Sequence, residues 1–146
     1  QFPDLKLIAV GPDKYETPTI GSLVSGVNKK LNREAVSYMD YVKDDKLTDL
    51  YAGAKALVYV SDREAFGLPP MEALSFGVPP VIADNELGHE LFGEYAFYSK
   101  SGEVDDIANA IKQALTDENP SAKLRARIKS EGPEFVKKYN WKNVVL

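Results

Sequence analysis

Apolar residues in this chain follow two alternating patterns. The short runs at 5–11 and 54–60 are rich in β-branched residues and are typical of strands. From position 17 onward, apolar residues recur instead at intervals of three and four, which predicts an amphipathic helix; they are Ile20, Leu23, Val24, Val27 and Leu31. Gly11 and Pro12 close the first run and predict a turn between the first strand and this helix.

Both patterns continue along the rest of the chain. Further strands are predicted at 35–39, 80–83 and 96–98, and further helices at 44–54, 87–92 and 105–115. Pro69 and Pro70 predict the start of another helix, ending near Phe76, because proline is favoured in a first helical turn. Residues 121–139 are predicted to be helical with an interruption at Gly132 and Pro133.

This alternation of strands and helices predicts the α/β class. We expect a Rossmann-like, open and mostly parallel sheet with helices on both faces. The run at 54–60 is almost continuously apolar, which predicts a central strand covered on both faces. Such sheets bind ligands at the carboxyl ends of their strands. The candidate binding loops are therefore those that follow Val10, Val60 and Ala83.

The composition excludes several classes of function. The 146 residues suit one domain with its own core, and the lack of cysteine excludes a disulfide framework or a thiolate metal site. A formal charge of -4 argues against a nucleic acid partner. No apolar run approaches the ~20 residues that cross a bilayer. Since the chain begins with Gln1 and not Met, we expect it to be a piece of a longer protein.

Candidate chemistry is concentrated in the loop after the run at 54–60. Glu64 lies in this loop, and Glu72 is predicted in the first turn of the helix that Pro69 and Pro70 begin. That helix start offers free N–H groups and a positive dipole end for a diphosphate, and Gly67 allows close approach of the backbone. A carboxylate only accepts hydrogen bonds, so Glu64 and Glu72 suit the hydroxyl groups of a sugar or a ribose.

Each of these residues also has a purely structural explanation. A first-turn glutamate favours the helix dipole, proline is an ordinary helix start, and glycine after an aromatic residue is often a turn. His89 is the only histidine, and we interpret it as an exposed residue at a helix end with no catalytic role, because a histidine acts as acid or base only with a partner.

The combination of these residues is more specific than its parts. Glu64 and Glu72 flank Phe-Gly-Leu-Pro, and Glu-Ala-Leu-Ser-Phe-Gly-Val-Pro follows. This pattern resembles the Glu-x7-Glu motif of the group 1 retaining glycosyltransferases, which have the GT-B fold. Residues 3–11 resemble a strand of their donor-binding domain, residues 47–54 the helix before the motif, and residues 105–111 with Trp141 its closing helices.

The resemblance implies a role for each matching residue. Glu64, the candidate catalytic residue, lies against the donor sugar, and Glu72 binds the ribose hydroxyls. The backbone of Phe66, Gly67 and Leu68 faces sugar and phosphate. The donor is a UDP-, GDP- or ADP-sugar, whose hexosyl group passes to an acceptor with retention by front-face displacement, so no protein nucleophile is needed. Neither a cofactor nor a bound metal is expected.

The resemblance also implies which parts lie outside this chain. Residues 1–146 correspond to the donor-binding domain without its first strand and helix. An arginine and a lysine that neutralise the diphosphate in the family precede the matching region, and the acceptor is bound mainly by a missing N-terminal domain. We therefore expect the fragment alone to be inactive. The expected location is the cytoplasm, with peripheral membrane contact through the missing part as an alternative.

Two other functions are compatible with the sequence. A GT-B sugar-nucleotide epimerase shares the fold and the nucleotide site, and would release a free sugar epimer without an acceptor. A non-catalytic nucleotide-sugar-binding module would bind the nucleotide without any transfer. The spacing of the motif favours transfer over both.

Overall fold

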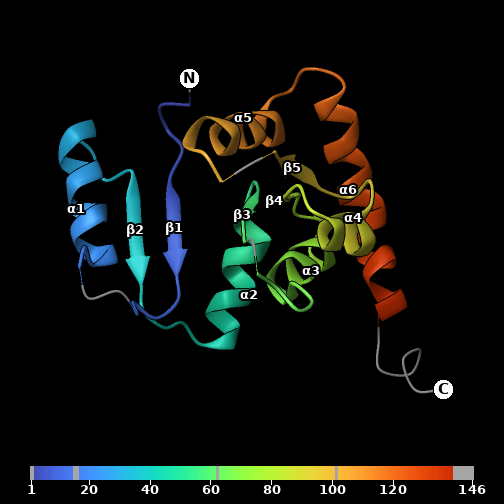
Figure 1. Cartoon of the computed structure of the whole chain (residues 1–146), viewed down its shortest axis with the longest axis horizontal. Coiled ribbons are helices and arrows are strands. Elements are labelled where there is room, and N and C mark those ends of the chain that lie inside the picture. The colour runs from blue at the N-terminus through green and yellow to red at the C-terminus, as the bar shows by residue number, and fades with distance from the viewer. Residues whose placement is uncertain (1, 15–16, 62, 101, 140–146) are drawn as a thin grey trace. The chain divides into compact units, whose positions relative to one another are not determined.

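The structure is a computed structural model that describes residues 2–14, 17–61, 63–100 and 102–139. The chain forms two compact units, one up to Thr48 and one from Asp49 onward, and each contains its own parallel sheet (Figure 1). The predicted α/β class with parallel pairing is confirmed. The single continuous sheet that we expected is replaced by a two-stranded and a three-stranded sheet. Trp141, one of the residues that carried the family resemblance, lies outside the described residues.

The first unit consists of two strands and a helix. Strand β1 (Leu7–Val10) pairs in parallel with β2 (Val36–Met39), and helix α1 (Ile20–Leu31) connects them and packs on β2 (Figure 1). Asn28 fastens the helix to the strand: its amide group donates to the carbonyl of Val36 at 2.8 Å and accepts from the N–H groups of Ala35 and Val36 at 2.8 and 2.9 Å. The side chain thereby satisfies backbone groups that the short sheet leaves unpaired.

The N-terminus of α1 is closed by side chains of the same unit. Thr19 is the N-cap and accepts from the N–H of Ser22 at 3.1 Å. The carboxylate of Asp13, in the loop after β1, accepts from the N–H of Ile20 at 2.6 Å. Two of the free donors at this helix start are therefore already used, and a carboxylate already occupies its positive dipole end.

The second unit contains the strands β3 (Leu57–Tyr59), β4 (Pro80–Ala83) and β5 (Phe97–Ser99), in the spatial order β3-β4-β5. Every residue of β4 is buried, whereas those of β3 are only partly buried. The prediction that the run at 54–60 is the central strand is wrong for this sheet, because β4 lies in the middle and β3 at the end. The apolar run reflects contact with helices, which an end strand can also make. Helix α2 (Asp44–Gly53) precedes β3 and contains the boundary between the two units.

Four further helices complete the second unit: α3 (Leu68–Ser75), α4 (Glu86–Phe92), α5 (Val104–Leu115) and α6 (Ser121–Val136). A short 3-10 turn, η1 (Lys137–Tyr139), follows. Helix α5 packs on β4 and β5, and α3 packs on β3, β4 and α6. The core between these elements includes the fully buried side chains of Leu74, Val81 and Ile128.

The expected interruption at Gly132 and Pro133 is wrong, because α6 runs through both residues. Proline inside a helix removes a hydrogen bond and costs about 3 kcal/mol. Here the helix buries Ile128 and Gly132 against α3. Tertiary packing of this face outweighs the local penalty of the proline.

Candidate functional site

The candidate site lies at the carboxyl ends of β3 and β4. The two strands are parallel and Tyr59 is opposite Ile82, so the loops that follow them leave the sheet at the same edge. A hollow of about 30 Å³ lies there, enough for a water-sized group such as one hydroxyl. It is lined by Tyr59, Ser61, Glu64, Gly67, Pro70, Ile82, Ala83, Asn85, Leu87, Gly88, Leu91 and Phe92.

Gly67 ends the first of these loops and begins α3. It is the N-cap of the helix with φ +73°, in the left-handed region that other residues rarely adopt. A Cβ on Gly67 would make only an ordinary van der Waals contact with the ring of Phe92, at 3.5 Å, so the backbone angle and not a lack of space disfavours other residues here. The turn into the helix therefore requires glycine, independently of any ligand.

The start of α3 offers two backbone donors. The first four backbone nitrogens of a helix have no hydrogen-bond partner inside the helix. In α3, two of these four belong to Pro69 and Pro70, which have no N–H. The N–H groups of Gly67 and Leu68 remain, and neither has a hydrogen-bond partner within the described residues. In contrast to the start of α1, no side chain of the described residues caps this helix start, which leaves the two donors for an anion.

Glu72 is not in the first turn of α3, contrary to the sequence prediction. The helix begins at Leu68, so Glu72 is its fifth residue and lies in the second turn. The helix starts one residue earlier than predicted, since Leu68 follows the N-cap Gly67 as the first helical residue, and this moves Glu72 past the first turn. Glu72 is exposed and does not line the hollow.

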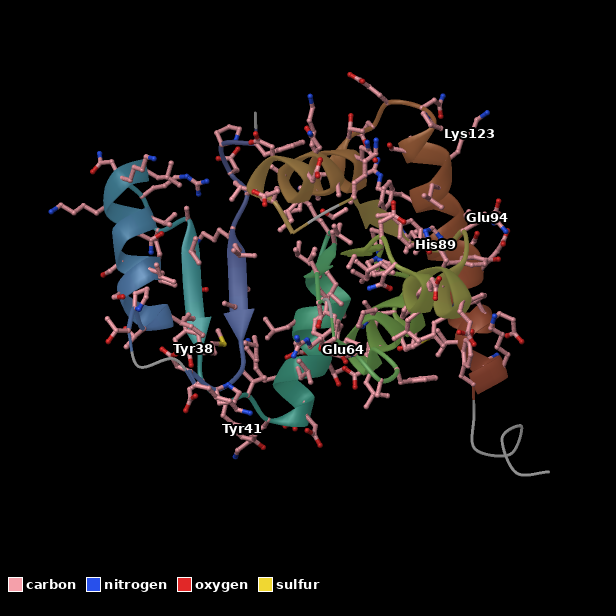
Figure 2. All side chains as sticks on the ribbon, viewed as in Figure 1. Tyr38, Tyr41, Glu64, His89, Glu94 and Lys123 are labelled. Atoms are coloured by element: carbon pink, nitrogen blue, oxygen red, sulfur yellow. The ribbon has the colours of Figure 1, made fainter. Side chains whose placement is uncertain are left out.

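Glu64 lines the hollow with its side chain held in place. The hydroxyl of Tyr59, on β3, donates to the Oε1 atom of Glu64 at 2.5 Å. This hydrogen bond, together with burial, raises the pKa of Tyr59 to about 12. The phenol is therefore a proton donor to Glu64 over the whole physiological range. Figure 2 labels Glu64 in the loop between β3 and α3.

Glu72 has an analogous partner. The hydroxyl of Tyr51, on α2, donates to its Oε2 atom at 2.8 Å. Burial and the hydrogen bond to Glu72 raise the pKa of Tyr51. Each carboxylate of the Glu-x7-Glu motif therefore accepts a hydrogen bond from a tyrosine hydroxyl of a neighbouring element.

The start of α4 forms the opposite wall of the hollow. Asn85 is its N-cap, and the side-chain oxygen accepts from the N–H of Gly88 at 2.8 Å. A Cβ on Gly88 would lie only 2.9 Å from the carbonyl oxygen of Ala83. Glycine at this position lets α4 approach the end of β4, which makes the hollow narrow.

His89 has a partner that sequence reasoning missed. Its Nε2 atom lies 2.6 Å from a carboxylate oxygen of Asp84, which follows β4. The imidazole also stacks on the ring of Tyr98, with centroids 4.2 Å apart. His89 is half exposed, in the last turn of α4, and is not among the residues that line the hollow. The position that we predicted for it, exposed near a helix end, is confirmed; its role stays a prediction.

The structure thus brings only some of the predicted residues together. Glu64 and Gly67 line one hollow. Phe66 turns its ring into the core against Tyr139, at a centroid distance of 5.6 Å, so only its backbone can face a ligand. The side chain of Leu68 is exposed. Sequence reasoning missed Tyr51, Tyr59 and Gly88. The spacing Asn85-x-x-Gly88 is typical of a capped helix start and could have indicated Gly88. Nothing in the local sequence links either tyrosine to the carboxylate that it contacts.

The described residues also bear on metal binding and on membrane insertion. Across the described ranges, no group of three or more histidine, aspartate and glutamate side chains is arranged to hold a metal ion. None of the helices in the same ranges combines the length and apolar character needed to cross a membrane.

Comparison with known protein families shows which family the chain belongs to. The family model described as "Glycosyl transferases group 1" matches residues 1–135. The chain therefore belongs to the group 1 glycosyltransferases, and the resemblance seen in the sequence is confirmed at the level of the family.

The curated relatives include bacterial transferases and synthases. One is an O-antigen chain mannosyltransferase B of Escherichia coli, 36% identical over 108 residues, which are 74% of this chain and 27% of that protein. Another is a mannosylfructose-phosphate synthase of Agrobacterium fabrum, 33% identical over 128 residues, 84% of this chain and 28% of that protein. The chain thus spans little more than a quarter of the length of these two relatives.

Solved structures show the same fold. A sucrose-phosphate synthase from Thermosynechococcus elongatus superposes with a TM-score of 0.71 at 23% identity, covering 95% of this chain and 35% of that chain. A pneumococcal O-GlcNAc transferase, solved with UDP and GlcNAc, gives 0.65 at 22% identity over 99% of this chain and 29% of that chain. The expected GT-B type of fold is confirmed by these neighbours.

Proposed function

We propose that residues 1–146 form the donor-binding part of a glycosyltransferase, which binds a nucleotide diphosphate sugar and passes its hexosyl group to an acceptor with retention at the anomeric carbon. The observation that carries the proposal is the juxtaposition, at one sheet edge, of the carboxylate of Glu64 with the N-terminus of α3, which no side chain of the described residues caps. A carboxylate suits sugar hydroxyls, and free N–H groups at a helix start suit a diphosphate.

Each predicted residue has a definite part in this proposal. The N–H groups of Gly67 and Leu68 bind an oxygen of the diphosphate, with the backbone of Phe66 beside them. Glu64 accepts hydrogen bonds from sugar hydroxyls at the hollow. Glu72, in the second turn of α3, accepts from the hydroxyls of the ribose. The two glutamates accordingly bind different ends of one extended ligand, which agrees with only Glu64 lining the hollow.

The proposed reaction needs no nucleophile from this chain. The acceptor hydroxyl attacks the anomeric carbon from the face that the nucleoside diphosphate leaves, so the configuration is retained. The C–O bond to the diphosphate breaks as the new glycosidic bond forms, and the acceptor proton goes to the departing phosphate oxygen. The acceptor, and the cationic groups that neutralise the diphosphate, are proposed to be held by parts of the protein outside residues 1–146. No cofactor or metal is part of the proposal.

The names of the relatives support mannose as the sugar. Both the Escherichia coli relative above and an O-antigen chain protein of Salmonella typhimurium, 34% identical over 80 residues, are called mannosyltransferases. Because this chain spans only 27% and 23% of those two proteins, mannosyl transfer is a proposal. The names of the relatives cited here describe transferases and synthases, which does not favour the epimerase or the non-catalytic module.

The binding proposal is tested by calorimetric titration of the chain with UDP, GDP and ADP. We expect one of them to bind, and Glu72→Gln to weaken that binding about three- to tenfold, because it removes a charged acceptor of ribose hydroxyls. Glu118→Gln is the matched control, since Glu118 is exposed in the loop before α6 and outside the hollow. Equal affinities of all three proteins would refute the role of Glu72.

The role of Glu64 is tested by sugar transfer in the longer protein that contains this chain. We expect Glu64→Ala to lose transfer while nucleoside diphosphate binding is retained, since Glu64 faces the sugar. Unchanged transfer would remove Glu64 from the reaction. Release of free sugar epimer without acceptor would favour the epimerase, and binding without transfer by the unmodified protein would favour the non-catalytic module.

A further inference from the structure

We propose that Tyr51 is the positioning residue for Glu72, and that it thereby makes the site selective for a ribonucleotide over a nucleotide that lacks the ribose hydroxyls. The proposal rests on the proposed function of Glu72. Its basis is the hydrogen bond from the hydroxyl of Tyr51 to the Oε2 atom of Glu72, 2.8 Å long, which joins α2 to α3.

Tyr51 is suited to position a partner because it is itself fixed. Its side chain is partly buried, and its ring stacks on Phe76, with centroids 5.6 Å apart and planes 15° from parallel. Phe76 is the C-cap of α3, so the ring rests on the same helix that carries Glu72. The phenol hydroxyl is thus a rigid donor in a defined place.

Glu72 needs such a partner because it is exposed. A glutamate side chain on a helix surface samples several rotamers, and fixing them on ligand binding costs conformational entropy. A carboxylate has about four acceptor positions, of which Tyr51 uses one. With its rotamer fixed in advance by the tyrosine, the carboxylate keeps the remaining positions for two adjacent hydroxyl groups.

The phenol acts only as a donor in this arrangement. Burial and the hydrogen bond to Glu72 raise the pKa of Tyr51 above its usual value of 10.0, so the phenol keeps its proton across the physiological pH range. The hydrogen bond between them therefore persists across the physiological pH range, and the selectivity for ribose hydroxyls does not depend on pH within it.

The test is the affinity of Tyr51→Phe for a nucleoside diphosphate and for its 2′,3′-dideoxy analogue, using whichever of UDP, GDP or ADP binds the unmodified chain. We expect the ribonucleotide to bind about three- to tenfold more weakly, because one hydrogen bond to a charged group is lost. The dideoxy analogue should bind both proteins equally. A merely structural role of Tyr51 would weaken both ligands alike.

Tyr95→Phe is the matched control. Tyr95 is also a partly buried phenol that donates to an exposed helical glutamate, Glu131, at 2.7 Å, and neither residue lines the hollow. We expect this variant to bind both nucleotides as the unmodified chain does. Equal weakening by Tyr95→Phe and Tyr51→Phe would overturn the inference.

A double variant separates this inference from the proposed function. In a background of Glu72→Gln, Tyr51→Phe should cause no further loss, because the group that it positions is already changed. If Glu72→Gln itself leaves the preference for the ribonucleotide intact, the proposed function of Glu72 is wrong. If Glu72→Gln removes that preference and Tyr51→Phe does not reduce it, only the role of Tyr51 is wrong.

Phe76→Leu tests the inference even if Tyr51→Phe does not fold. Phe76→Leu leaves the hydroxyl in place and removes the ring on which Tyr51 stacks. We expect a smaller loss of the preference for the ribonucleotide, about twofold, with unchanged dideoxy binding. An unchanged preference in this variant, together with an unchanged preference in Tyr51→Phe, would overturn the inference.

Discussion

The contact between α3 and α6 gives the sharpest prediction about the scaffold of the site. Gly132 lies inside α6, and a Cβ at this position would be 2.9 Å from the backbone carbonyl oxygen of Leu74 on α3. That is about half an ångström closer than an optimal carbon contact of ~3.5 Å. Because the Cβ is fixed rigidly to the backbone of α6 and the oxygen belongs to the backbone of α3, Gly132→Ala can be accommodated only if the helices move apart.

Two opposing terms determine the size of the effect. Alanine is favoured over glycine inside a helix by about 1 kcal/mol. Overpacking a well-packed contact costs about 1–3 kcal/mol, and a Cβ before Pro133 adds to this cost because it crowds the proline ring. We expect the free energy of unfolding to fall by about 1 kcal/mol in Gly132→Ala.

Gly26→Ala is the matched control for this prediction. Gly26 lies inside α1, and a Cβ there would meet nothing within 4 Å. The same substitution should therefore stabilise the first unit by about 1 kcal/mol. Both variants gain the same helix propensity, so it cancels when their changes in the free energy of unfolding are subtracted. What remains is the cost of the overlap at Gly132, about 1–3 kcal/mol.

Native-state hydrogen exchange can measure both effects in the unit where each occurs. The amide of Val81, on the middle strand β4, reports on the second unit, and the amide of Val36, which donates to Asn28, reports on the first. The reasoning is refuted if Gly132→Ala stabilises the second unit as much as Gly26→Ala stabilises the first.

Three further predictions concern the core, the turn into α3 and the effect of pH. Leu74→Ala should lower the free energy of unfolding in urea by about 2–5 kcal/mol, because Leu74 is fully buried, and a loss below 1 kcal/mol would contradict this. Gly67→Ala should lower the free energy of unfolding by about 1–2 kcal/mol in the same measurement, because φ is +73° at this position. It should also weaken nucleoside diphosphate binding. An unchanged free energy of unfolding would contradict the expected backbone strain. Burial, and then the charge of Asp84, raises the pKa of Tyr98 to about 12 from 10.0. The contribution of Tyr98 to the free energy of unfolding is therefore complete below pH 10 and is lost as the pH rises towards 12. An ultraviolet titration of the folded chain, compared with that of Tyr98→Phe, measures the pH at which this phenol ionises. Ionisation of Tyr98 near pH 10 would contradict the prediction.

The periodicity of the sequence predicted most of the elements, because strand and helix patterns are local. The helix predicted from the recurrence of Ile20, Leu23, Val24, Val27 and Leu31 is α1, and the strand predicted at 80–83 is β4. The failures occurred where packing decides. Pro133 is a local reason to end a helix, yet α6 continues through it, because its buried face packs against α3.

The candidate site was predictable to a similar degree. Glu64, Gly67 and the prolines that follow it lie within a few residues, so the loop and the helix start could be recognised from the sequence. The turn of α3 that carries Glu72 could not be recognised, because the helix begins at Leu68, one residue before the prolines. The partnership of His89 with Asp84 also depends on how α4 packs beside the end of β4.

The sequence by itself determined the alternation of strands and helices, the position of the loop with Glu64, and the need for glycine and proline at the start of α3. Each of these depends on interactions between residues that are near neighbours in the chain. Only the tertiary structure decided that β4 is the middle strand of its sheet, and that Tyr59 and Tyr51 hold the two motif carboxylates. Tyr51 and Glu72 are 21 residues apart, and which phenol reaches which carboxylate depends on how α2 and α3 pack in the folded second unit.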